Sequence, residues 1–197
     1  MPATDPNPGD TLVWNGSGWQ AQNEMVERGF LAWNAPIGNA NGVGLFVTQN
    51  EIAVKVPLLK AISCTSVTLS VSTAGSTLTS GQNLVTVYSA AGVLIGQTAS
   101  QDAVWNTAGT YTMALASGPF ALSGPYVWVG ILSNGTTPAT FRCLASTAAL
   151  ANAGGAGALA GQALRSGRIG AAVTAPASFT PANLVITNAF CPWVALS

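Results

Sequence analysis

The chain of 197 residues has a mass of 19.8 kDa, which suffices for one domain with a substantial core and an extension. Only 6% of its residues are charged, against about 25% in typical soluble domains, while 49% are hydrophobic. This composition excludes disorder along the whole chain, because disordered chains combine low hydrophobicity with high charge. The net charge of zero offers little repulsion between copies, so we expect the protein to associate and to act within an assembly.

The first 22 residues predict an extended arm that carries a small β-hairpin. Pro and Asp keep the first ten residues extended, and Leu12, Val13 and Trp14 are followed by the turn residues 15–18 and by Trp19. A hairpin of this size is not stable alone in water. We therefore predict that Leu12, Val13, Trp14 and Trp19 anchor the chain to a partner protein or to sibling subunits. A hairpin packed on its own domain fits the sequence equally well.

Charge divides the chain into an acidic leader and a basic remainder. Residues 1–51 contain five acids and one arginine, a net charge of −4, and residues 52–197 contain five basic residues and one acid, a net charge of +4. An acidic leader can dock on a basic body, its own or that of a neighbouring copy. So few dispersed charges also fit an ordinary solvated surface. The leader lacks the basic and apolar regions of a secretory signal, so we expect synthesis and folding in a cytosol.

Residues 23–50 are typical of a connector. Residues 24–31 fit one or two helical turns, and residues 34–44, rich in Asn, Gly and Pro, predict a loop. We therefore divide the chain into an anchoring arm with its connector at residues 1–50 and a β-sandwich domain at residues 51–197.

From residue 52 onward, short runs of β-branched and aromatic residues alternate with turn residues such as Ala91-Gly92 and Asn134-Gly135. Turn signals every ~8–12 residues indicate an all-β sandwich or barrel rather than alternating βα units. We predict a jelly-roll-like antiparallel β-sandwich. Residues 126–132 are apolar on both faces, which indicates a central strand or an interface. The predicted strands are 52–57, 66–72, 83–89, 93–98, 110–116, 126–132, 140–144, 168–173 and 184–196.

Two stretches of low charge need separate interpretation. Residues 143–164 carry no charge, but Asn152, Gln162 and several glycines interrupt them, which argues against a membrane span. Within them, residues 146–161 are rich in Ala and Gly and predict a mobile or partner-packed loop. Cys64, Cys143 and Cys191 predict buried, reduced thiols on strands, with one disulfide as the alternative.

The residues that most enzymes need are scarce. The chain contains no histidine, which excludes Ser-His-Asp and Cys-His catalysis and imidazole metal sites. Asp102 is the only acid after residue 51, so the sandwich cannot supply the carboxylate pair of a glycosidase. Six basic residues without a cluster do not support nucleic-acid binding. We expect a non-enzymatic protein without cofactor or metal that binds neither nucleic acid nor membrane.

The stretch 80–115 carries a resemblance. Its pattern of Gly-Gln-Asn, a hydrophobic run, Tyr-Ser-Ala-Ala-Gly, a second hydrophobic run, Gly-Gln-Thr, a Trp and the strand Tyr-Thr-Met-Ala-Leu resembles β-sandwich domains in minor tail and head-decoration proteins of tailed bacteriophages, especially those infecting actinobacteria. The similarity runs from roughly residue 54 to the C-terminus. The phrase Gly-Asp-Thr-Leu-Val-Trp-Asn-Gly-Ser-Gly-Trp in the leader resembles an element at the attachment end of phage fibre and tail proteins.

The resemblance implies a structural protein on the virion surface, assembled in the cytoplasm of the host bacterium. Among such roles we favour capsid decoration, in which a homotrimer clamps adjacent capsomers and contacts the major capsid protein. The alternative is a minor tail protein, in contact with tail proteins, that binds a host receptor or carbohydrate through exposed rings such as Trp105, Trp33 or Tyr111. Packing of these rings in the core is the competing interpretation.

Overall fold

The computed structural model describes residues 11–14, 17, 19–22, 24–44, 49–144, 165–171, 173–185 and 191–197. The Ala/Gly-rich residues 146–161, predicted as a loop, lie outside this range. The described helical segments are α1 (Glu24–Glu27) and the 3-10 turns η1 (Ile37–Asn39) and η2 (Pro181–Asn183).

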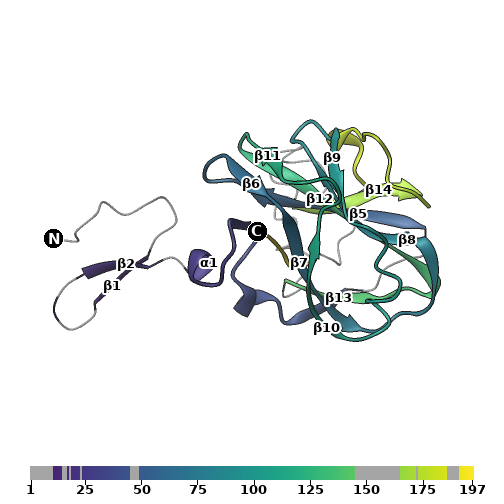
Figure 1. Ribbon diagram of the computed structural model, residues 1–197, viewed down its shortest axis with the longest axis horizontal. Helices are drawn as coiled ribbons and strands as arrows, with labels where there is room; N and C mark the ends of the chain where they lie inside the picture. The colour runs from purple at the N-terminus through teal and green to yellow at the C-terminus, as the bar shows by residue number, and fades with distance from the viewer. Residues whose placement is uncertain are drawn as a thin grey trace.

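Every pairing between described strands is antiparallel, and most strands form two sheets that face each other (Figure 1). This confirms the predicted all-β sandwich. The first sheet has the order β14 (Ser166–Ala171), β5 (Asn50–Pro57), β12 (Tyr126–Thr137), β8 (Ser76–Tyr88) and β9 (Leu94–Gln97). The second has the order β3 (Ala32–Trp33), β15 (Val194–Leu196), β7 (Ser66–Thr73), β13 (Thr140–Cys143) and β4 (Gly42–Gly44), with β10 (Gly109–Ala114) also paired to β7. Two further pairs are β6 (Ile62–Cys64) with β11 (Phe120–Leu122), and the hairpin β1 (Thr11–Trp14) with β2 (Trp19–Gln22).

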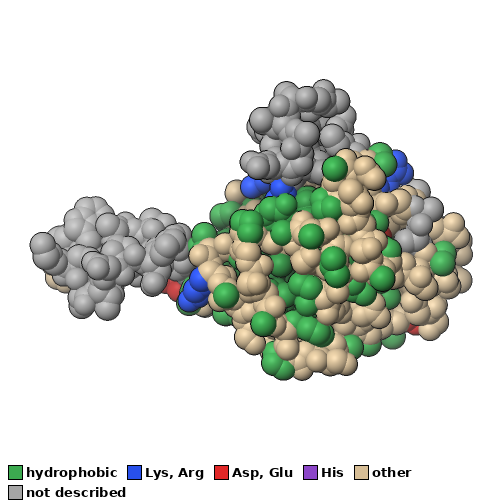
Figure 2. All heavy atoms as spheres, turned by 90° about the horizontal axis from the view of Figure 1, so that it is seen from above, with side chains coloured by type: hydrophobic (Ala, Val, Ile, Leu, Met, Phe, Trp, Pro, Cys, Tyr) green, Lys and Arg blue, Asp and Glu red, His purple; other side chains and the backbone are tan. Residues whose placement is uncertain are grey.

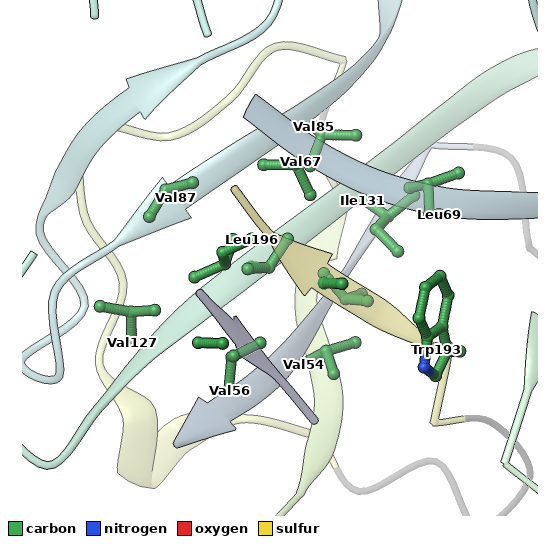
Figure 3. Packing of buried hydrophobic residues seen from close by; sticks show 14 of the residues in the cluster. Val54, Val56, Val67, Leu69, Val85, Val87, Val127, Ile131, Trp193 and Leu196 are labelled. Carbon is green, nitrogen blue, oxygen red and sulfur yellow. The ribbon is translucent and has the colours of Figure 1, made fainter. Parts of the chain in front are cut away.

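The core lies between the inner faces of the two sheets. Successive side chains of a strand point to opposite faces, so every second residue of β5, β7 and β12 enters the same cluster. Burying each of these side chains contributes roughly 1.5–3 kcal/mol before entropy is counted. Figure 3 shows members of this cluster from both sheets, among them Val54, Val56, Val67, Leu69, Val85, Val87, Val127 and Ile131.

Strand β12 is central, as its sequence predicts. It pairs with β5 on one side and with β8 on the other. All residues from Val127 to Leu132 are buried. Both faces of the first sheet are therefore covered, the inner face by the second sheet and the outer face by another part of the chain.

The C-terminal strand β15 lies between β7 and the early strand β3. The buried side chain of Asn34 joins the two segments, because its Nδ2 donates to the Pro192 carbonyl at 2.7 Å and its Oδ1 accepts from the Val194 amide at 3.0 Å. Trp193 Nε1 donates to the Ala35 carbonyl at 2.9 Å. Strands β3 and β4 thus carry the second sheet of the sandwich back to Ala32, inside the range predicted as arm and connector.

Two local predictions are wrong. Asn134 and Gly135, predicted as a turn, lie inside β12, where the register with β8 shifts between Ser133 and Gly135. The buried Asn83 side chain absorbs this bulge: its Oδ1 accepts from the Asn134 amide at 3.0 Å and its Nδ2 donates to the Asn134 carbonyl at 3.0 Å.

The second correction concerns residues 184–196, predicted as one closing strand. Val185 forms only an isolated bridge to Arg168, and β15 begins at Val194. Pro192, which has no amide proton to donate, precedes β15 and forms a single bridge with Cys143.

We expect Asn34→Ala to lower the free energy of unfolding by about 2 kcal/mol or more, because it leaves a buried amide and a buried carbonyl without partners. Urea denaturation measures the change. Asn39→Ala is the matched control, since Asn39 is exposed. Equal stability of the two variants would contradict the role assigned to Asn34.

Candidate functional site

The arm hairpin has the pairing that its sequence predicts. Strands β1 and β2 are antiparallel, with Leu12 opposite Ala21, Val13 opposite Gln20 and Trp14 opposite Trp19. Figure 1 shows the hairpin to one side of the sandwich, joined to it through α1. It does not cover the sandwich in this arrangement. The part that Leu12, Val13, Trp14 and Trp19 play in binding stays a prediction.

The root of the arm is packed on the sandwich. Met25 is buried, and the Phe30 ring lies 5.8 Å from Trp193 and 6.3 Å from Trp33, measured between ring centroids. The exposed side of α1 carries Val26 and the ion pair of Arg28 Nε with Glu24 Oε1 at 3.0 Å. The sandwich therefore holds the connector at residues 25–35, and the hairpin extends beyond that point.

The three rings considered for sugar stacking lie on different elements and differ in exposure. Trp105 is fully buried and packs edge-on against Phe141, with 4.9 Å between ring centroids. Trp33 is half-buried on β3, and the half-buried Tyr111 on β10 donates its hydroxyl to the Thr107 carbonyl at 3.0 Å. All three rings contact the main core cluster. Trp105 as an exposed sugar-binding ring is therefore wrong.

A buried carboxyl lies on the outer face of the first sheet. Glu51 on β5 is fully buried, and its Oε1 accepts from Thr86 Oγ1 at 2.6 Å and from the Tyr88 hydroxyl at 3.0 Å. Gly130 on β12 makes room for this group, since a Cβ there would lie 2.0 Å from Glu51 Oε1 and 2.2 Å from Thr86 Oγ1. Burial raises the pKa of Glu51 to about 7, against the lowering effect of the bonds from Thr86 and Tyr88. The sequence did not predict the burial of Glu51, which was counted only as one of the five acids of residues 1–51.

Residues 173–185, which we call the flap, cover this outer face. The flap is tied to the sheet edges by backbone hydrogen bonds, among them Phe179 N to Gly92 O at 2.9 Å and Val185 N to Arg168 O at 3.0 Å. The Phe179 ring packs edge-on against Tyr88 at 5.0 Å and against Trp128 at 6.1 Å, between centroids. Together with Leu184 and Ala53 these rings form a second, smaller apolar cluster.

A groove of about 530 Å³ lies along the flap and β14. Its lining combines the apolar Ile169, Val173, Phe179 and Leu184 with uncharged Thr, Ser and Asn side chains. The flap and the groove were not predicted as a site, because residues 174–181 have only the composition of a loop.

The three cysteines are unpaired and buried. Cys64 and Cys143 end strands β6 and β13, whereas Cys191 precedes the bridge at Pro192. Burial, and secondarily the neighbouring Cys191, raises the pKa of Cys143 to about 12. The Cys143 thiol is therefore protonated at neutral pH and a poor nucleophile.

Within the described ranges, no group of three or more Cys, Asp or Glu side chains has an arrangement that could hold a metal ion. The described residues also include no helix that is long and apolar enough to cross a membrane. Comparison with protein-family models, with curated proteins and with solved structures finds no match for the chain.

The buried carboxyl predicts a fall in stability as pH rises. The pKa of Glu51 is about 7 in the folded chain against 4.5 without the fold, so the folded state binds the proton more tightly between these values. We expect the contribution of Glu51 to the free energy of unfolding to decrease by about 3 kcal/mol from pH 4.5 to pH 7 and then to level off. Glu51→Gln should remove this decrease, as measured by urea denaturation at a series of pH values.

Glu27→Gln, which removes an exposed carboxyl, is the control and should keep the decrease. A Glu51→Gln profile that still falls like that of the wild type would contradict the assignment.

Proposed function

We propose that the chain is a non-enzymatic structural protein of a bacteriophage particle, displayed on the virion surface and held there by its hairpin. Among such roles we favour a capsid decoration protein that stabilises the head. It acts as a homotrimer and contacts the major capsid protein. The hairpin that stands to one side of the sandwich is the observation that carries this proposal (Figure 1). A two-stranded hairpin has too little core to be stable alone, so a partner must cover it.

The surface of the sandwich is consistent with a subunit that is packed among neighbouring subunits of a particle. The face in Figure 2 carries mostly hydrophobic and uncharged polar side chains, with lysine and arginine at its margins. A surface without net charge resists self-association poorly in free solution, whereas fixed neighbours in a particle satisfy it. The sequence resemblance to head-decoration and minor tail proteins supplies the viral setting.

The antiparallel sandwich suits a displayed subunit in mechanical terms. Its core is closed by pairing between β3 and β15, which lie at opposite ends of the sandwich sequence. The arm joins the sandwich at α1, next to the pairing of β3 with β15 (Figure 1). A load on the arm is thus transmitted to the strand pairing that joins both ends of the domain.

The alternative role is a minor tail protein that binds a host receptor or carbohydrate. The buried Trp105 removes one of the rings on which this role depended. Binding of the purified protein to host cells or to a glycan array, together with loss of infectivity but not of head stability when the protein is removed, would favour the tail role.

We expect deletion of residues 1–22 to abolish incorporation into particles, because it removes the anchor and leaves the sandwich intact. Trp14→Ala with Trp19→Ala should weaken attachment by about 2 kcal/mol or more for each ring that is a central contact. Occupancy is measured by quantitative mass spectrometry of purified particles.

Leu59→Ala is the matched control, since Leu59 is an exposed hydrophobic residue in the turn between β5 and β6. Normal occupancy of the deletion variant would refute the anchor and, with it, the proposed mode of attachment.

A further inference from the structure

Among the described residues, strand β10 has a neighbouring strand along one side only. It pairs antiparallel with β7. Just beyond the strand, the Leu115 amide donates to the Thr65 carbonyl at 2.9 Å, which fixes how the hydrogen bonds alternate along this ladder. The odd-numbered residues of β10 therefore direct their amides and carbonyls towards β7. The even-numbered residues, Thr110, Thr112 and Ala114, direct theirs away from β7, along the edge of the sheet.

No described strand pairs with this edge of β10, and its three even-numbered residues are exposed. Beyond the strand, the Ala116 amide donates to the Gln97 carbonyl of β9 at 2.8 Å, so β9 meets the edge only at its end. The loop that leads from β9 to β10 is bonded to β8 instead, through the Gln101 amide and the Asn83 carbonyl at 2.6 Å. Figure 1 shows β10 beside β7, apart from both the arm hairpin and the flap. The backbone groups along this edge are thus available to a further strand.

The edge of β10 lacks the features that keep most exposed edge strands from pairing with other chains. Such strands usually carry lysine, proline or a β-bulge, or they are very short. Strand β10 has six residues, Gly-Thr-Tyr-Thr-Met-Ala, and its register with β7 is regular. The sequence contains no charged residue between Asp102 and Arg142. Two copies of this strand can therefore approach each other without repulsion between like charges on the strand.

The edge of β10 is complementary to itself. In an antiparallel pair, a residue at a hydrogen-bonded position donates its amide proton to the opposite residue and accepts one from it. A twofold axis beside Thr112 places Thr112 of one copy opposite Thr112 of a second copy, and Thr110 of each copy opposite Ala114 of the other. All amides and carbonyls of the edge are then paired. The side chains that meet are small and uncharged, and threonine is a residue that favours strands.

We infer that β10 of one copy pairs with β10 of a second copy about a twofold axis. The second sheets of the two sandwiches then form one continuous sheet across the contact. This inference does not depend on the anchoring role of the arm, because β10 and the hairpin are separate elements. A twofold contact cannot by itself close a trimer, so in the proposed particle it joins subunits of two different trimers.

A charge swap at Thr112 tests this contact, because the axis places this residue opposite its own copy. Thr112→Lys brings two like charges opposite each other, which opposes pairing, and Thr112→Glu does the same with negative charge. An equimolar mixture of the two variants instead brings opposite charges together. Both substitutions also remove the hydrogen bond of 2.7 Å between the Oγ1 atoms of Thr112 and Thr68. Thr112→Val loses this bond without gaining a charge and is therefore the matched control.

Native mass spectrometry and light scattering report the number of subunits, and near-UV circular dichroism with urea midpoints verifies that each variant is folded. We expect Thr112→Lys and Thr112→Glu each to show half the subunit number of the wild type, with a dissociation constant raised at least tenfold. The mixture should restore the full number, with both variants present in equal amounts. Thr112→Val should keep the full number. So should Thr79→Lys, because Thr79 is exposed on β8 in the other sheet.

The same subunit number in Thr112→Lys and in the wild type would overturn the inference, as would a mixture that stays at half that number. These measurements use the purified protein, so their outcome is separate from that of the incorporation experiment. The pairing of β10 can fail while deletion of residues 1–22 still prevents incorporation into particles. It can also hold while that deletion has no effect.

Discussion

The insertion of β15 between β3 and β7 is the constraint on which the rest of the sandwich depends. All three residues of β15 are buried, and Ser197 beyond it accepts hydrogen bonds from the amides of Thr65 and Ser66 at 2.7 and 2.8 Å. On the other side, the Leu31 amide donates to the Leu196 carbonyl at 2.7 Å. Strand β3 joins the second sheet only through its pairing with β15. Folding must therefore bring together residues that are far apart in sequence, which slows closure relative to local hairpins.

The first sheet has two buried faces of different character. Its inner face enters the main apolar core, whereas its outer face holds Tyr88, Trp128 and the carboxyl of Glu51. Antiparallel sheets commonly leave one face to solvent. In this protein Phe179 and Leu184 of the flap pack on Tyr88, Trp128 and Ala53 of that face.

Much of the fold follows from local sequence, because the β-branched and aromatic runs of β5, β7 and β12 and the Gly92 turn are set by residues next to one another. Strands β3, β4, β6 and β11 have only two or three residues, too few to show a period, and their pairing is decided by distant partners. The hairpin of β1 and β2 was predictable from the turn residues between its two strands. The burial of Glu51, and the bulge that Asn83 stabilises at Asn134, depend on neighbouring strands, for which the sequence carries no local signal.

The low content of charged residues, 6% of the chain, has a consequence for the stability of the protein at different ionic strengths. One ion pair within the described ranges is the exposed contact between Arg28 and Glu24, which contributes little to stability. The sandwich is held by apolar burial and neutral hydrogen bonds, so dissolved electrolyte should leave the subunit itself unaffected.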